Sequence, residues 1–422
     1  MTTQTLYTMT ADLPVSTPRL GDGDIRVLLL ENIHEDGAEF LRAQGYQVET
    51  RKGALGEDEL IEAVQGVHLL GIRSTTYVTE RVLEHAPDLL SIGAFCIGTN
   101  QIDLKAAAAR GVAVFNAPYS NTRSVVELAI GEIISLARRL NEKTNDMHAG
   151  VWNKSAQGSH EIRGRKLGIV GYGNIGSQLS VIAEALGMQV FYFDVADKLA
   201  LGNAKRCATL HELLETVDVV TLHVDGRPGN AGLFGADEFA RMKPRSLFLN
   251  LSRGILVDTK ALRAHIESGH IAGAAVDVFP VEPKKQGDPF ESDLRGLPNV
   301  ILTPHVGGST MEAQQDIGRF VAGKLHSYLA EGSTDLSPNL PHLQLPSYGE
   351  HHRLVHIHHN VPGVLSAINV VLGNHGVNID GQTLGTRGEI GYVLTDIDKQ
   401  LEPETLTALG TLPETIRLRQ LS

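Results

Sequence analysis

The chain has 422 residues, of which 42% are hydrophobic and 20% charged, as is typical of a folded globular protein. Its length predicts two or three domains. The formal net charge of −12 argues against nucleic acid as a partner. The two cysteines, Cys96 and Cys207, form neither a disulfide framework nor a metal-binding spacing, so we predict a reducing, cytoplasmic location. No apolar run reaches the ~20 residues that span a membrane, and we expect no membrane partner.

The first part of the chain alternates apolar strands with helical segments. Residues 1–18 lack the basic start and apolar core of a secretory signal and are predicted to be a flexible extension. The pattern predicts a parallel α/β domain over residues 19–120. A long helix over 311–330 is expected to return the chain to this domain, so residues 308–335 are assigned to it. Strands are expected at 25–30, 46–50, 67–72, 89–95 and 112–115, and helices at 36–44 and 57–64.

A second α/β domain is predicted for residues 121–307. Ser124 and Glu127 resemble a capping box, which favours a helix from Ser124 to Arg139. Asp258 is expected to cap a helix over 259–268. Five strand candidates follow the apolar run 166–170, namely 188–194, 218–224, 246–251, 273–279 and 299–303. With helical stretches between several of them, they predict a doubly wound nucleotide-binding sheet.

A glycine-rich loop follows the apolar run 166–170 and leads into a helical pattern. Gly171 permits a tight turn, Gly173 lets a pyrophosphate approach the backbone, and Gly176 lets the helix pack on the strand. The helix start offers free N–H groups to phosphates. Asp194 closes the next strand, at the spacing expected for a carboxylate on an adenosine ribose, and its charge opposes a 2′-phosphate. The loop therefore predicts NAD as cofactor in preference to NADP.

Three side chains near predicted strand ends suit hydride transfer to or from a 2-hydroxy acid. Arg253 directly follows a strand and can grip carboxylate and carbonyl oxygens with its planar fork. His305 also follows a strand and can take the hydroxyl proton in oxidation and return it in reduction. Glu282 can bind the other ring nitrogen, fix the tautomer and raise the basicity of the imidazole. Each residue alone is an ordinary surface or structural residue; their joint placement indicates catalysis.

Over roughly residues 24–330 the sequence resembles the D-isomer-specific 2-hydroxyacid dehydrogenases. The matching stretches are Asn-Thr-Arg-Ser-Val-Val-Glu-Leu (121–128), Gly-Tyr-Gly-Asn-Ile-Gly (171–176), Asn-Leu-Ser-Arg-Gly (250–254), Ala-Ala-Val-Asp-Val-Phe-Pro-Val-Glu-Pro (274–283) and Leu-Thr-Pro-His-Val-Gly-Gly-Ser-Thr (302–310). The resemblance implies two Rossmann-like doubly wound parallel-sheet domains. It implies that Arg253 binds the substrate carboxylate, that Glu282 is the partner of His305, and that His305 is the acid/base. Cofactor contacts are expected from Asn174, Ile175 and Asp277.

The resemblance also implies a substrate with an anionic end bound by Arg73, Ser74 and Asn121. Arg73 and Ser74 follow a predicted strand of the first domain. A guanidinium, hydroxyls and a helix N-terminus, should a helix begin there, would suit a phosphate. The other interpretation of this segment is a plain joint between a strand and a helix.

The C-terminal part of the chain has a different pattern. Residues 336–349 contain Gly, Ser and Pro and are predicted to be a linker. Residues 350–422 then predict a ferredoxin-like βαββαβ unit. Its strands are expected at 354–357, 378–383, 391–397 and 416–421, and its helices at 364–372 and 405–412.

This unit resembles ACT domains, in which paired modules bind a small effector between them. By that resemblance His358, Asn360 and Asn378 bind the effector. The alternative is a metal site built from His351, His352, His356, His358 and His359. Alternation along a strand would divide these histidines between two faces, so we predict no metal.

Together these observations predict an NAD-dependent enzyme for a small-molecule substrate. The sequence is most similar to the branch of the family that oxidises D-3-phosphoglycerate to 3-phosphohydroxypyruvate, the first step toward serine. This similarity implies L-serine as effector, and we expect a homotetramer. The alternatives are a reductase of another 2-oxo acid, such as hydroxypyruvate, glyoxylate or 2-oxoglutarate, and an NAD-sensing co-repressor without enzymatic activity.

Overall fold

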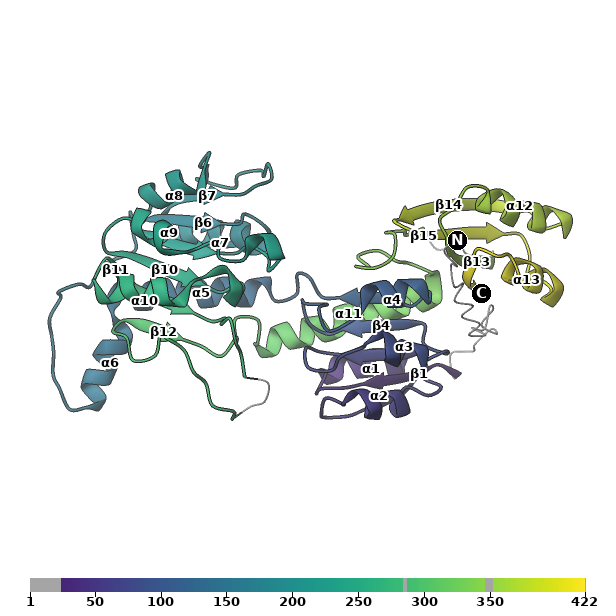
Figure 1. Ribbon diagram of the computed structural model, residues 1–422, viewed down its shortest axis with the longest axis horizontal. Helices are drawn as coiled ribbons and strands as arrows, with labels where there is room; N and C mark the ends of the chain where they lie inside the picture. Colours follow the sequence, from purple (N-terminus) through teal and green to yellow (C-terminus); the bar gives the residue numbers. More distant parts are fainter. Residues whose placement is uncertain (1–23, 284–286, 346–351, 422) are drawn as a thin grey trace, which may run out of the picture. The chain divides into compact units, whose positions relative to one another are not determined.

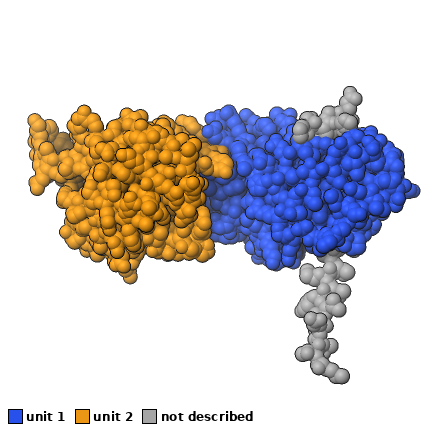
Figure 2. All heavy atoms as spheres, turned by 90° about the horizontal axis from the view of Figure 1, so that it is seen from above, with its two compact units in different colours: residues 1–118, 314–422 blue, residues 119–313 orange. Residues whose placement is uncertain are grey.

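The computed structural model describes residues 24–283, 287–345 and 352–421. The predicted N-terminal extension, residues 1–18, lies outside these ranges. The chain forms two compact units (Figure 2). The first unit comprises residues 1–118 and 314–422, and the second comprises residues 119–313. Within the described ranges, no helix is both long and apolar enough to cross a membrane.

The first unit contains a five-stranded parallel sheet of order β2-β1-β3-β4-β5. Figure 1 labels two of its strands, β1 and β4. Its strands are β1 (Arg26–Leu29), β2 (Gln47–Thr50), β3 (Leu69–Ile72), β4 (Ser91–Ala94) and β5 (Ala113–Asn116). The helices between them are α1 (Glu35–Ala43), α2 (Glu57–Ala63), α3 (Glu80–Glu84) and α4 (Leu104–Ala109). The parallel α/β prediction is confirmed.

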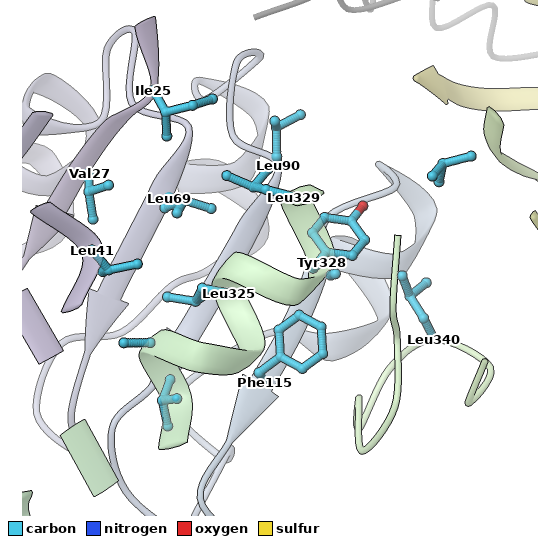
Figure 3. Close-up of a cluster of buried hydrophobic side chains, with 14 of the residues drawn as sticks. Ile25, Val27, Leu41, Leu69, Leu90, Phe115, Leu325, Tyr328, Leu329 and Leu340 are labelled. Atoms are coloured by element: carbon cyan, nitrogen blue, oxygen red, sulfur yellow. The ribbon is translucent and has the colours of Figure 1, made fainter. Parts of the chain in front are cut away.

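The long helix α11 (Met311–Glu331) completes the core of this unit. The side chains of Leu325, Tyr328 and Leu329 pack with residues of the sheet such as Leu69 and Phe115 (Figure 3). Apolar residues recur along the buried stripe of the helix, as expected for a helix that covers a sheet.

The second unit is built on a seven-stranded parallel sheet of order β12-β11-β10-β9-β6-β7-β8. Its strands are β6 (Lys166–Val170), β7 (Gln189–Phe193), β8 (Lys205–Arg206), β9 (Val219–Leu222), β10 (Ser246–Asn250), β11 (Ile271–Val276) and β12 (Val300–Leu302). The helices are α5 (Thr122–Arg138), α6 (Leu140–His148), α7 (Asn174–Ala185), α8 (Leu210–Thr216), α9 (Ala236–Arg241) and α10 (Thr259–Glu267), and the 3-10 turns are η2 (Pro228–Asn230) and η3 (Gly254–Leu256). The strand order reverses at β6, which is the point where doubly wound sheets bind dinucleotides.

The starts of helices α5 and α10 in this unit differ in how well they match the sequence. The capping box at Ser124 is wrong: α5 begins at Thr122 after Asn121, and Ser124 lies inside the helix, where its hydroxyl contacts Thr310 Oγ1 at 2.8 Å. The cap at Asp258 is confirmed, since its carboxylate accepts hydrogen bonds from the N–H groups of Lys260 and Ala261.

The described residues 352–421 belong to the first unit but form a sheet of their own, and we call them the C-terminal unit. This unit is an antiparallel four-stranded sheet of order β14-β15-β13-β16 with two helices, which confirms the ferredoxin-like prediction. Its elements are β13 (His352–His359), α12 (Val364–Asn374), β14 (Ile379–Arg387), β15 (Ile390–Ile397), α13 (Pro403–Gly410) and β16 (Thr415–Leu421). Strand β13 has two buried faces. Leu354 packs with α12 and α13, whereas Val355 and Ile357 join the core that contains α11.

The described part of the predicted linker is packed against the first sheet. Leu340 is fully buried. The Asn339 amide donates to Val112 O and accepts from Val114 N, both at 2.9 Å, and so pairs with the backbone at strand β5. Residues 332–345 are therefore a docked segment of the first unit.

Candidate active site

The glycine loop between β6 and α7 has the local geometry that its sequence predicts. Gly171 has φ +93°, and a Cβ there would lie 2.6 Å from His223 O. A Cβ at Gly176 would lie 2.3 Å from Gly171 O, so the helix packs against the loop as only glycine allows. At Gly173 a Cβ would meet no protein atom within 4 Å, which leaves open space for a ligand. Asn174 and Ile175 form the first turn of α7, whose N–H groups suit phosphate oxygens.

Asp194 follows β7, and its carboxylate is fixed by backbone N–H groups. Oδ2 accepts from Tyr172 N in the glycine loop, and Oδ1 accepts from Ala196 N, each at 2.8 Å. The carboxylate therefore lies beside the loop that would hold the pyrophosphate. An acceptor at this place suits the hydroxyls of an adenosine ribose.

The structure brings His305 and Glu282 together. His305 Nδ1 lies 2.9 Å from Glu282 Oε2, and Glu282 Oε1 accepts from Phe279 N at 3.0 Å. The hydrogen bond that His305 donates to Glu282 raises the pKa of His305, although desolvation acts to lower it. Burial acts to raise the pKa of Glu282, but the hydrogen bonds and the charges of His305 and Arg253 outweigh it, so that pKa is lowered. The pair favours a charged imidazole next to a carboxylate.

Arg253 lies close enough to the pair to influence both pKa values, so all three predicted catalytic residues belong to one electrostatic cluster. Its Nη1 donates to Ser252 O at 2.6 Å. The next residue, Gly254, is required by a close approach: a Cβ there would lie 2.0 Å from the carbonyl carbon of Phe279. Gly254 thus lets the Arg253 loop pack against the segment that leads to Glu282, a role that its position after arginine alone does not reveal.

Asp277 holds the loop that carries His305. The Asp277 side chain is 1% exposed. Its Oδ1 accepts from Thr303 Oγ1 at 2.6 Å and Val306 N at 2.8 Å, and its Oδ2 accepts from Gly307 N at 2.8 Å. The backbone oxygen of Asp277 accepts from His305 N at 2.8 Å. His305 itself has φ +54°, an uncommon value for a residue with a side chain. Asp277 therefore fixes a strained loop, and its cofactor contact stays a prediction.

Glu132 is a further buried carboxyl in this unit that sequence reasoning missed. It lies on α5, and neither of its side-chain oxygens has a hydrogen-bond partner among the described residues. Desolvation, and then the charge of Asp277, raises its pKa to about 8. Nothing in its helical sequence distinguishes it from an exposed glutamate.

The predicted phosphate contacts Arg73 and Ser74 lie in the first unit, after β3. The carboxylate of Glu31 accepts from the N–H groups of Arg73, Thr75 and Thr76 at 2.8–3.1 Å. Gln101 Nε2 donates to Arg73 O at 2.6 Å. A helix N-terminus here is wrong, because α3 begins only at Glu80 and Glu31 already binds these N–H groups. Glu31 is a supporting residue that sequence reasoning missed.

Asn121, the third predicted substrate contact, is the N-cap residue of α5 in the second unit. Its Oδ1 is buried and has no hydrogen-bond partner within the described ranges. A Cβ at Gly308 would lie 2.1 Å from Asn121 Nδ2, so a side chain there would displace the amide.

The three predicted effector residues do not bond to one another within one chain. His358 is buried, and its Nδ1 lies 2.8 Å from His359 O. Asn360 is exposed and donates to Gly388 O, while Asn378 donates to Asp380 Oδ1. His351 lies outside the described residues. Among the described residues, no group of three or more His, Cys, Asp or Glu side chains is arranged to hold a metal.

Comparison with known proteins extends these observations. Residues 130–307 match the D-isomer specific 2-hydroxyacid dehydrogenase, NAD binding domain, and residues 354–417 match an AHAS small subunit-like ACT domain. The chain is 51% identical to D-3-phosphoglycerate dehydrogenase of Escherichia coli (strain K12), over 94% of this chain and 97% of the relative. It is 48% identical to D-3-phosphoglycerate dehydrogenase 2 of Saccharomyces cerevisiae, over 93% of this chain and 86% of the relative.

A solved structure shares the dehydrogenase part of the chain. NAD-dependent formate dehydrogenase from Staphylococcus aureus, solved in complex with NAD, is 25% identical with a TM-score of 0.61. The match covers 72% of this chain and 95% of that one. The near full-length relatives and this solved structure indicate the same family. The chain belongs to the D-3-phosphoglycerate dehydrogenase branch of the D-isomer-specific 2-hydroxyacid dehydrogenase family.

Proposed function

We propose that this protein is an NAD-dependent dehydrogenase that oxidises D-3-phosphoglycerate to 3-phosphohydroxypyruvate, the first step of L-serine biosynthesis. The observation that carries the proposal is the contact of 2.9 Å between His305 Nδ1 and Glu282 Oε2, at the same edge of the sheet as the glycine loop. The near full-length similarity to enzymes of that name supports the choice of substrate.

Bound NAD supplies the hydride acceptor, and the chain supplies the proton acceptor and the grip on the substrate. Because Glu282 occupies Nδ1, His305 has Nε2 left to take the C2 hydroxyl proton as the C2 hydride departs. Arg253 binds the carboxylate and polarises the forming carbonyl. In the reverse direction His305 returns the proton. Arg73 and Ser74 bind the phosphate, and Asn121 contributes its unpaired amide oxygen to the substrate hydroxyls.

A substrate panel tests this assignment. We expect turnover with D-3-phosphoglycerate and NAD, and slower reduction of hydroxypyruvate, glyoxylate and 2-oxoglutarate. Arg73→Gln should raise the KM for the phosphorylated substrate at least about tenfold, because a charge-assisted contact is lost. It should change the KM for unphosphorylated acids far less. Equal effects on both would favour another 2-oxo acid as substrate, and absence of turnover would favour the co-repressor.

We further propose that L-serine is the effector of the C-terminal unit and that the protein is a cytoplasmic homotetramer. The ACT-domain match supports an amino acid effector. His358, Asn360 and Asn378 are the proposed contacts, and their separation within one chain suits a site completed by a second module. Light scattering with and without L-serine measures the assembly.

A further inference from the structure

The second unit has a cationic groove on the edge of its sheet opposite to the glycine loop. One hollow, of about 550 Å³, is lined by Arg139, Lys143 and Arg245 together with Glu142 and Asp146. A smaller hollow shares Arg139 and Arg245 with it and adds Arg165 and His160. The two hollows form one groove, with four cationic against two acidic side chains. On a chain of net charge −12 such an excess of positive charge is local.

The groove lies at the amino ends of the strands, away from the catalytic residues. Arg165 directly precedes β6, and Arg245 directly precedes β10. At their carboxyl ends the same strands lead to Gly171 and to the loop that carries Arg253. A five-residue strand spans about 16 Å, so the groove and the catalytic edge are separated by the length of the strands. An anion in the groove is therefore not a substrate bound at Arg253.

Two of the arginines have the same unusual backbone conformation. Arg139 has φ +54° and Arg245 has φ +65°, in the left-handed region that glycine occupies without strain. Gly158 makes room for Arg139, because a Cβ there would lie 3.2 Å from Arg139 Cδ. Local conformation thus favours glycine at both positions, yet both carry guanidiniums that line one groove.

The cations of the groove are only partly neutralised. Arg139 pairs with Glu142, with Nη2 2.7 Å from Oε1, and Lys143 Nζ donates to Asn153 O at 3.3 Å. The guanidinium of Arg245 makes no hydrogen bond or ion pair within the described ranges. Desolvation, and then the charges of Arg165 and Arg245, lowers the pKa of His160, which places that imidazole in the field of both guanidiniums.

We propose that this groove binds a small oxyanion with at least two negative charges, a phosphate or a polycarboxylate, as a second ligand site of the enzyme. The volume suits a ligand of metabolite size. Arg245 is the principal anchor, since its planar fork can bind two oxygens at once. Arg139 and Arg165 complete the cationic wall.

Calorimetric titration of the intact enzyme with inorganic phosphate and with citrate tests the proposal. Arg245→Gly should weaken binding of at least one of the two anions about tenfold or more, because a charge-assisted contact is lost. It should leave kcat/KM within a factor of two. Thermal stability without anion should not fall, since glycine suits φ +65°. Arg245→Lys should retain part of the affinity, and Arg263→Gln, which removes an exposed arginine of α10, is the matched control.

Three results would overturn the site. One is an unchanged affinity for both anions in Arg245→Gly. Another is loss of all anion binding in Arg253→Gln, which would place the anion at the catalytic edge. The third is a smaller oligomer mass for Arg245→Gly, which would make the groove an interface between copies. The affinity of the wild-type enzyme for phosphate, compared with its affinity for citrate, shows whether the groove prefers a phosphate or a polycarboxylate.

Discussion

His305 depends on Glu282 for its basicity. His305→Gln removes the proposed proton acceptor while keeping a polar side chain of similar size. We expect it to fold and bind NAD but to turn over at least about a hundredfold more slowly, the usual contribution of general acid/base catalysis. Steady-state kinetics with NAD-binding fluorescence measures both. Activity within a factor of two of wild type would remove His305 from the mechanism.

The pH dependence gives a second test of the same pair. Oxidation needs a neutral imidazole, so the rate falls as pH drops below the pKa of His305. The hydrogen bond to Glu282 raises that pKa. Glu282→Gln should therefore shift the acid limb of the kcat/KM profile to lower pH. The pair stabilises the fold between its two pKa values, and this stabilisation is lost as pH rises through the raised pKa of His305 or falls through the lowered pKa of Glu282. An acid limb that stays in place would contradict the role of Glu282.

Asp194 offers a test of cofactor choice. Asp194→Ala deletes an acceptor for the ribose and a charge that repels a 2′-phosphate. The ratio of kcat/KM for NAD to that for NADP should fall. Because Asp194 also accepts from Tyr172 N, circular dichroism should show that the variant keeps its fold. An unchanged ratio would count against the assignment, and Asp197→Ala, an exposed carboxylate nearby, is the control.

At the scale of elements, the two loops proposed to contact the substrate are each held by a carboxylate from elsewhere in the sequence, the Arg73 loop by Glu31 and the His305 loop by Asp277. Glu31 binds the N–H groups of Arg73, Thr75 and Thr76 from about forty residues away. Glu31→Gln keeps the shape but provides only one good acceptor oxygen for three donors. We expect KM for D-3-phosphoglycerate to rise several-fold with a smaller change in kcat, and the KM for NAD to stay constant. A selective fall in kcat would contradict a positioning role.

The same elements show what sequence can and cannot predict. The strands other than β8, and the helices α7, α10 and α12, were predictable because each carries an apolar run, an apolar stripe or a capping residue. The two exposed residues of β8 have no such pattern. Helix α6 was not, because none of its residues is buried and its sequence therefore lacks an apolar stripe. The roles of Glu31, Asp277 and Gly254 could not be predicted either, since each depends on a contact with a segment distant in sequence. The pairing of Glu282 with His305 was predictable because both lie in stretches that carry the family resemblance, and the catalytic roles of the two residues and of Arg253 stay predictions.

At the scale of the molecule, the C-terminal unit is part of the core of the first unit. Val355 and Ile357 are buried in the cluster that contains α11. Arg417 is 3% exposed and donates to Leu89 O at 2.5 Å. Tyr392 Oη donates to Gly332 O at 2.7 Å. The C-terminal unit is therefore not a separable appendage.

A chain that ends after residue 345 should consequently lose stability as well as regulation. Each large aliphatic side chain left without its partner costs about 1.5–3 kcal/mol. We expect a lower Tm and increased binding of a hydrophobic dye, with NAD binding by the second unit retained. A truncated chain with the Tm of the full chain would show that the contacts of Arg417 and Tyr392 contribute little.

Point variants in the intact chain are therefore the better test of regulation. Asn360→Ala or Asn378→Ala should weaken inhibition by L-serine while sparing uninhibited turnover, because an asparagine amide can accept from the ammonium and donate to the carboxylate of an amino acid. Both side chains are exposed and bond only locally, so their loss should not unfold the unit. Asn374→Ala, at the end of α12, is the control. The measurement is a serine titration that follows binding and rate together.

Because the effector residues lie in a different unit from His305, inhibition requires that serine bind two global states of the protein with different affinity. If wild type neither binds L-serine nor slows in its presence, the effector is another small molecule or the unit serves assembly alone.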